Sequence, residues 1–280
     1  MAGTFVKFIR DSIGDIMCIY FNLFGLNLPA YGFCIALGVI ASNVIALRMI
    51  HKYGLDFNDL VILEAYCMLG GFIGAKILYF IVSYKTIEWQ RITETKYFNQ
   101  LMQGGFVFYG GLIGGLLLTF LAGKIHKINE IEYVRKFIFL IPFIHSFGRV
   151  GCFMAGCCYG MPYDGPGAVV FPAGSYAPAG IKLFPIQLVE AGLLLCIAII
   201  ILLMQIYKNY VLSVELYLLL YSTARFVLEF FRYDDIRGKV AGLSTSQWIS
   251  IFILIGTHIE LIIKHKKSED IAQKGFCTNK

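Results

Sequence analysis

The chain has 280 residues, of which 58% are apolar and 15% charged, and its mean hydropathy is +0.71. A soluble globular domain is typically about 45–50% apolar and about 25% charged, so this composition excludes a soluble domain and predicts a polytopic membrane protein. The formal net charge of +6 does not indicate a nucleic-acid partner, because Lys and Arg fall mostly in short segments between apolar runs.

Residues 1–28 mix acidic and apolar side chains and lack the hydrophobic stretch and cleavage site of a secretory signal. We expect a short amphipathic lead-in at the membrane surface. Seven apolar segments follow, each close to the roughly 20 residues that a helix needs to cross a bilayer. They are 29–50, 60–84, 105–124, 137–155, 185–207, 211–232 and 244–264. The predicted fold is therefore all-α, with one membrane-embedded domain over 1–264 and a disordered cytoplasmic tail over 265–280.

The charges between these segments predict how the chain is oriented. If seven spans alternate, one side carries more Lys and Arg, including Lys52, Lys127 and Lys208. Because short cytoplasmic loops are enriched in positive charge, this side is expected to be cytoplasmic. The N-terminus then lies outside and the C-terminus inside. The Gly/Pro-rich loop 161–185, which cannot form a long helix, lies outside as a lid or small head region.

Glycine pairs recur within the second and third segments. Gly70-Gly71, Gly110-Gly111 and Gly114-Gly115 give small-xxx-small spacings. This spacing favours close packing of two membrane helices. Approach of the backbone to a ligand is the alternative.

Ionisable side chains inside apolar segments are costly, by at least about 2.5–3.5 kcal/mol near the bilayer centre, and so point first to function. This chain places Glu64, Lys76, Arg149, Glu190, Arg225, Glu229 and Arg232 in such segments. Tyr221, Arg225 and Glu229 recur every four residues and share one helix face. The stripe predicts either a structural ion pair or an anion site. In the second case Arg149 supplies another guanidinium, and two guanidiniums suit a phosphate.

Gln187 and Glu190 lie three residues apart after Pro185, which favours the start of a helix. Their spacing places them on one helix face. Helix-end capping with hydrogen bonds between helices is one interpretation, and membership of the anion site is the other.

The stretch HSFGRVGCFMAGCCYG, residues 145–160, gathers three of the chain's eight cysteines. His145, Cys152, Cys157 and Cys158 are four candidate zinc ligands, but adjacent cysteines fit a single tetrahedral centre poorly. The alternatives are a disulfide from Cys152 to Cys157 or Cys158, and packing of small side chains around a glycine-rich turn. Packing is favoured, and we expect no metal site.

Six motifs occur in a fixed order along the chain. They are Tyr31-Gly32, GGFVFYGGLIGG, GRVGCFMAGCCYG, FPIQLVE, RFVLEFFR and STSQW. In these motifs the sequence resembles the prolipoprotein diacylglyceryl transferase family, over about residues 29–260.

The resemblance implies a seven-helix enzyme of the bacterial plasma membrane without a metal or organic cofactor. Such an enzyme moves the diacylglyceryl group of phosphatidylglycerol to the lipobox cysteine thiol of a preprolipoprotein and releases glycerol phosphate. Its partners are these two substrates and membrane lipids, with no nucleic acid. Arg149 and Arg225 match the family's essential arginines. The other residues at recognisable family or substrate-binding positions are Tyr31, Gly110, Gly111, Gln187, Glu190, Tyr221 and Glu229.

Two departures from the family pattern bear on proton transfer. Tyr109 stands where many members carry a histidine. It is expected to position the lipid phosphate or to relay a proton, and packing at the interface is the alternative. Cys152, Ala155 and Cys157 stand where many members have Asn, Asn and Glu. The alternative functions are a non-catalytic lipid-binding or transport protein on the same scaffold, and a transferase with a different acceptor.

Overall fold

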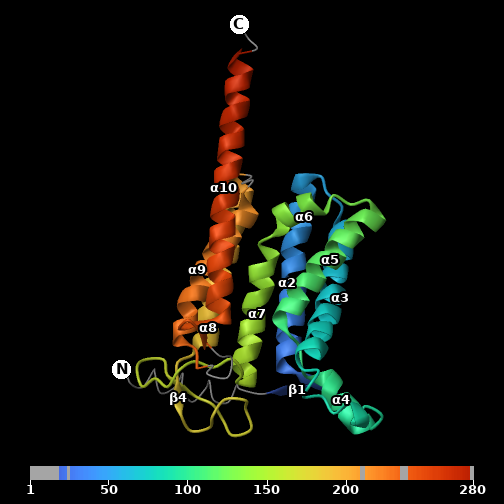
Figure 1. Cartoon of the computed structure of the whole chain (residues 1–280), viewed down its shortest axis with the longest axis vertical. Helices are drawn as coiled ribbons and strands as arrows, with labels where there is room; N and C mark the ends of the chain where they lie inside the picture. Colours follow the sequence, from blue (N-terminus) through green and yellow to red (C-terminus); the bar gives the residue numbers. More distant parts are fainter. Residues whose placement is uncertain (1–18, 24–25, 209–211, 234–238, 278–280) are drawn as a thin grey trace. The chain divides into compact units, whose positions relative to one another are not determined.

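A computed structural model describes residues 19–23, 26–208, 212–233 and 239–277 (Figure 1). The described chain is mostly helical, and its few strands form separate two-stranded pairs, which confirms the all-α prediction. The fold divides into two compact units, where the sequence predicts one domain. Unit 1 comprises Met1–Val44 and Arg135–Lys280, and unit 2 comprises Ile45–Val134.

Unit 1 holds the helices that carry most of the predicted site. They are the first part of α2 (Ala30–Tyr53), α7 (Leu140–Ala155), α8 (Ile186–Lys208), α9 (Ser213–Leu228) and α10 (Thr245–Cys277). Helix α8 packs against both α7 and α9, and α10 packs against α9 (Figure 1). The sequence of α8 is suited to this central position, because one face buries apolar residues such as Leu194, Ile197 and Ile201.

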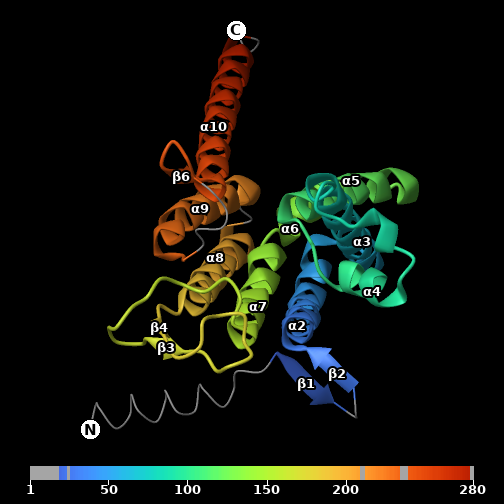
Figure 2. The same cartoon turned by 60° about the horizontal axis from the view of Figure 1, so that its bottom comes forward.

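Three antiparallel strand pairs also belong to unit 1. They are β1 (Tyr20–Leu23) with β2 (Leu26–Pro29), β3 (Val169–Val170) with β4 (Lys182–Leu183), and β5 (Lys239–Val240) with β6 (Leu243–Ser244). Figure 2 shows β1 and β2 leading into α2. The β3–β4 pair closes the Gly/Pro-rich loop 161–185 over a small core that includes Phe153 and Phe171. This loop therefore has a packed interior of its own.

Unit 2 is built on α3 (Phe57–Val82) and α5 (Phe108–His126), joined by the short helices η1 (Trp89–Arg91) and α4 (Thr95–Gln103). Helix α6 (Glu130–Phe137) follows α5 and extends across the boundary between the units. The buried charge of Lys76 has a structural role, because its Nζ donates to the Leu101 carbonyl at 2.5 Å and the Gly104 carbonyl at 2.7 Å. These are carbonyls that the end of α4 leaves without helical partners.

Glycines set the spacing of α3 and α5, as the small-xxx-small pattern predicts. A Cβ atom added at Gly70 would overlap the Gly114 carbonyl, and one added at Gly110 would overlap the Gly74 carbonyl. Only residues without a side chain allow the two backbones to approach so closely. The glycine pairs therefore serve helix packing.

The outer surface is that of a multi-pass membrane protein. Within the described residues, α2, α3, α8 and Thr245–Lys267 of α10 are long and apolar enough to cross a membrane. Helices α6 and α7, bent by 58°, pass the same test only when taken together, so the number rises to five if this pair counts as one span. Helices α5 and α9 occupy the two remaining predicted segments and are shorter, with 19 and 16 residues. Large apolar side chains are exposed, among them Ile40 at 62% and Phe72 at 61%, as expected of side chains that face lipid.

Three segments differ from the sequence predictions. The β1–β2 hairpin occupies the end of the predicted amphipathic lead-in, whose residues 1–18 lie outside the described part of the chain. Helix α9 ends at Leu228 and continues as the 3-10 turn η2 (Glu229–Phe231). Helix α10 runs to Cys277, so residues 265–277 are helical where a disordered tail is predicted. The polar composition of this segment gave no sign that a membrane helix would continue through it.

The glycine contact predicts a selective loss of stability. Gly70→Leu should lower the free energy of unfolding by about 1–3 kcal/mol, because a side chain there forces α3 and α5 apart. Gly192→Leu in α8 is the matched control, since a Cβ added at Gly192 meets no atom within 4 Å. Thermal unfolding in detergent measures both changes. Equal melting temperatures for the two variants would contradict the packing interpretation.

Candidate functional site

Charged side chains from three helices of unit 1 meet around one buried carboxylate. Nη2 of Arg149 on α7 lies 2.9 Å from Oε1 of Glu190 on α8. Nη1 of Arg225 on α9 lies 3.7 Å from the other oxygen, Oε2, of the same carboxylate. The side chain of Glu190 is 2% exposed, and those of Arg149 and Arg225 are 12% and 9% exposed. The two arginines thus share one site, and Glu190 joins them.

A second carboxylate completes this arginine cluster, which we define as Arg149, Glu190, Arg225, Glu229 and Arg232. Oε2 of Glu229, one helical turn further along, lies 2.6 Å from Arg225 Nη2 and 4.0 Å from Arg232 Nε. Three guanidiniums face two carboxylates, so the five side chains carry one positive charge in excess. Because charges interact strongly in a buried, low-dielectric site, this excess favours binding of a monoanion.

Among the buried guanidinium donors of the cluster, Nε of Arg149 and Nη1 of Arg225 have no hydrogen-bond acceptor within the described protein. Leaving an N–H of a charged group both buried and without an acceptor costs more than about 1–3 kcal/mol. Both donors therefore point to a ligand that brings acceptor oxygens into the cluster.

Aromatic residues surround the arginines. The Tyr221 hydroxyl is hydrogen-bonded to Arg149, and the Tyr221 ring lies edge-on to His145 at a centroid distance of 5.6 Å. The charges of Arg149 and Arg225 both act on His145. The sequence indicated His145 only as a candidate zinc ligand, and its place beside Tyr221 and the arginines was not predicted. Its spacing of four residues from Arg149 was the available signal, because such residues share a helix face.

Gln187 and Tyr31 lie at the edges of the cluster. Gln187 is fully buried, and its Nε2 donates to the Cys157 carbonyl at 2.9 Å, so it fixes the turn after α7. Tyr31 lies in the first turn of α2 beside Gly151, where an added Cβ would lie 2.8 Å from the Tyr31 Cα. Tyr31 is 47% exposed, and the positive charge of Arg149 acts on its hydroxyl group.

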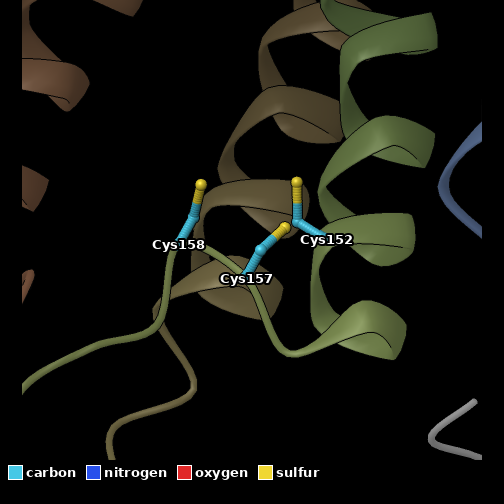
Figure 3. Close-up of side chains that lie close together, drawn as sticks. All are labelled: Cys152, Cys157 and Cys158. Atoms are coloured by element: carbon cyan, nitrogen blue, oxygen red, sulfur yellow. The ribbon is translucent and has the colours of Figure 1, made fainter. Parts of the chain in front are cut away.

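The cysteines of the motif form a thiol cluster, defined here as Cys152, Cys157 and Cys158. Their Sγ atoms all lie within 4.8 Å of one another (Figure 3). Helix α7 ends in a left-handed turn at Gly156, with φ of 73°, and Cys158 also has a positive φ of 56°. This turn brings the two successive thiols back toward Cys152. All three cysteines are free, so neither of the two disulfides considered from the sequence is formed.

Electrostatics distinguish Cys158 within the thiol cluster. Hydrogen bonds from Cys152 and Cys157, followed by the charges of Arg232 and Arg149, hold the pKa of the Cys158 thiol well below its usual range. The positive charges of the arginine cluster therefore act on the thiol cluster. His145 is not part of the group of thiols that could share a metal ion.

The remaining predicted site residues, Tyr109, Gly110 and Gly111, belong to unit 2. They lie in the first turn of α5, where Gly110 and Gly111 face the backbone of α3 at Gly74 and Gly71. The contacts of these two glycines are those of helix packing. Tyr109 is partly buried beside them.

Comparisons with known proteins agree with one another. The family model described as prolipoprotein diacylglyceryl transferase matches residues 18–263. The chain is 36% identical over 236 residues to phosphatidylglycerol–prolipoprotein diacylglyceryl transferase 2 of Clostridium perfringens, covering 84% of this chain and 90% of that protein. It is 34% identical to the phosphatidylglycerol–prolipoprotein diacylglyceryl transferase of Clostridium tetani, over 89% of this chain and 98% of that protein. The protein of the same name in Campylobacter lari is 30% identical to this chain, over 94% of this chain and 99% of that protein.

The shared carboxylate leads to a prediction about stability. Glu190→Ala should lower the free energy of unfolding by about 3–5 kcal/mol, because it leaves two buried guanidiniums without a common partner. Glu88→Ala is the control, since Glu88 pairs with Arg91 at the exposed surface of unit 2 and such pairs contribute little. Denaturant unfolding in detergent compares the two. A loss no larger for Glu190→Ala would show that the bridge is not a structural constraint.

Proposed function

The chain belongs to the prolipoprotein diacylglyceryl transferase family, and we propose that its arginine cluster binds the phosphate of phosphatidylglycerol during transfer of the diacylglyceryl group to the lipobox cysteine of a prolipoprotein. The protein is a multi-pass bacterial membrane transferase of lipoprotein biosynthesis. The observation that carries the proposal for the site is the pair of buried arginine donors, Arg149 Nε and Arg225 Nη1, that have no acceptor among the described residues.

The charge of the lipid headgroup matches that of the cluster. Phosphatidylglycerol contains a phosphodiester with one negative charge, which balances the one positive charge in excess. Its two non-bridging oxygens are acceptors for the N–H groups of Arg149 and Arg225. Guanidiniums suit this task because their planar arrangement of donors fits phosphate oxygens.

The transfer is a displacement at the primary glyceryl carbon. The acceptor sulfur forms the new C–S bond, the C–O bond to phosphate breaks, and glycerol phosphate leaves as a monoester with an additional negative charge. Arg149 and Arg225 stabilise this developing charge more strongly than the charge of the bound diester, which lowers the barrier. The acceptor reacts as a thiolate, and its proton passes to solvent.

Glu190, Glu229 and Tyr221 are positioning residues in this mechanism. The Glu190 carboxylate holds guanidiniums from α7 and α9 at fixed places, Glu229 orients Arg225, and Tyr221 is hydrogen-bonded to Arg149. Preorganised charges need little rearrangement as the leaving group departs.

Arginine-to-lysine variants test the proposed phosphate site. Arg149→Lys and Arg225→Lys should each lower turnover by about 10²–10³, because lysine keeps the charge and loses the donor fork. The double variant should lose less than the product of the single losses, since the two residues act together. Turnover is followed as the mass increase of a lipobox peptide incubated with phosphatidylglycerol.

The matched control is Arg91→Lys, because Arg91 belongs to unit 2 and its ion pairs with Glu88 and Glu94 are exposed. Each variant is first shown to be folded by its melting temperature. Folded Arg149→Lys or Arg225→Lys with near-normal turnover would remove that residue from the phosphate site. Phosphatidylglycerol binding without any peptide modification by the wild-type protein would favour a lipid-binding or transport protein, or a different acceptor.

We also propose that the N-terminus lies outside and the C-terminus in the cytoplasm of the plasma membrane. Lys127→Cys, at the end of α5, and Pro172→Cys, in the outer loop, should then differ in intact cells. An impermeant thiol reagent should label only position 172, and both positions after the membrane is permeabilised. The wild-type chain measures the background from native cysteines. Labelling of position 127 in intact cells would reverse the orientation.

A further inference from the structure

The thiol cluster has no part in the mechanism above. We propose that Cys152, Cys157 and Cys158 bind one thiophilic divalent cation of the zinc type, and that its open fourth position receives the thiol of the acceptor cysteine. Thiolate ligands select such cations. The cation site stands on the geometry of the three cysteines, whereas the role of its fourth position rests on the proposed transferase function.

The distances fit a single metal centre. With zinc–sulfur bonds of about 2.3 Å, two sulfurs of a tetrahedral site lie about 3.8 Å apart. The three Sγ atoms lie within 4.8 Å of one another, so they need to approach by at most about 1 Å. The sequence argued against one centre because Cys157 and Cys158 are adjacent. In the structure, the left-handed conformation at Cys158 allows the turn to bring the thiols of both Cys157 and Cys158 toward Cys152 (Figure 3). Adjacency therefore does not prevent the three from sharing one centre.

The surroundings hold the turn in place and bring positive charge close to it. The Cys157 N–H donates to the Cys152 carbonyl at 3.0 Å, and Gln187 Nε2 donates to the Cys157 carbonyl at 2.9 Å. Three thiolates around a divalent cation carry one net negative charge. The positive charges of Arg149 and Arg232 both act on the thiols.

Three protein ligands leave a coordination position for substrate, as in catalytic zinc sites. Cys152 is buried, whereas Cys157 and Cys158 are partly exposed, so the cluster is open on one side. An acceptor thiol that binds the cation loses its proton to solvent and is held as a thiolate. Its sulfur then attacks the glyceryl carbon, the C–O bond to phosphate breaks, and glycerol phosphate leaves. No electrons are transferred, and the cation keeps its charge.

Cobalt(II) is a suitable probe, because its visible and near-ultraviolet absorption reports thiolate ligands. Reduced, full-length protein in detergent should bind one Co²⁺ per chain with sulfur-to-metal charge-transfer bands, and Zn²⁺ should displace it. Cys152→Ala should abolish these bands. Cys196→Ala should retain them, because Cys196 is an exposed cysteine within α8. Absence of stoichiometric binding, or full binding by Cys152→Ala, would overturn the cation site.

A lipobox peptide tests the fourth position. Its addition should shift the cobalt bands, and the same peptide with Ser in place of Cys should not. Cobalt bands that do not respond to the cysteine peptide would overturn the acceptor role. Arg149→Lys separates this proposal from the transferase proposal, because it should lose turnover and still bind cobalt. Full turnover by metal-free, folded Cys152→Ala would refute the metal-dependent step and leave the transferase function intact.

Discussion

The bridge from Glu190 to two arginines constrains the whole of unit 1. Its carboxylate is 2% exposed, and burial of such an ion pair is stable only when the geometry is held closely. Each partner comes from a different helix, so α7, α8 and α9 must keep a fixed relative register. Small changes in packing at any of the three helices would separate the charges. The apolar face of α8 therefore serves the chemistry of the site as well as the stability of the bundle.

Helix α8 also connects the two clusters. Gln187 and Glu190 lie three residues apart on one face, and the first holds the turn of the thiol cluster while the second holds the arginines. Beyond α9 the chain returns to the same turn, because Gly160 and Arg232 form an antiparallel bridge and the Met161 N–H donates to the Phe231 carbonyl. The thiols and the guanidiniums are thus positioned by shared backbone contacts.

Local patterns in the sequence predicted what depends on local spacing. Hydrophobic length located the helices, and the four-residue spacing of Arg225 and Glu229 predicted their ion pair. The sequence did not show that Glu190 would join both arginines, because that contact depends on how three helices pack. For the same reason it left His145 out of the site, although its spacing from Arg149 was visible. The sequence singled out Cys152, Cys157 and Cys158 but did not show that their thiols converge, because a positive φ at Cys158 is a property of the folded turn.

Departure of the phosphate and attack by the sulfur are both favoured by nearby positive charge. The departing phosphate gains negative charge, and the attacking sulfur must already carry it. Guanidiniums placed between these partners stabilise the leaving group and also favour thiolate over thiol. This explains how cysteines can stand beside Arg149 at such a site. When the same positive charges act on both the leaving phosphate and the attacking sulfur, the site has less need of a separate general base. The proton then leaves the acceptor thiol before the C–S bond forms.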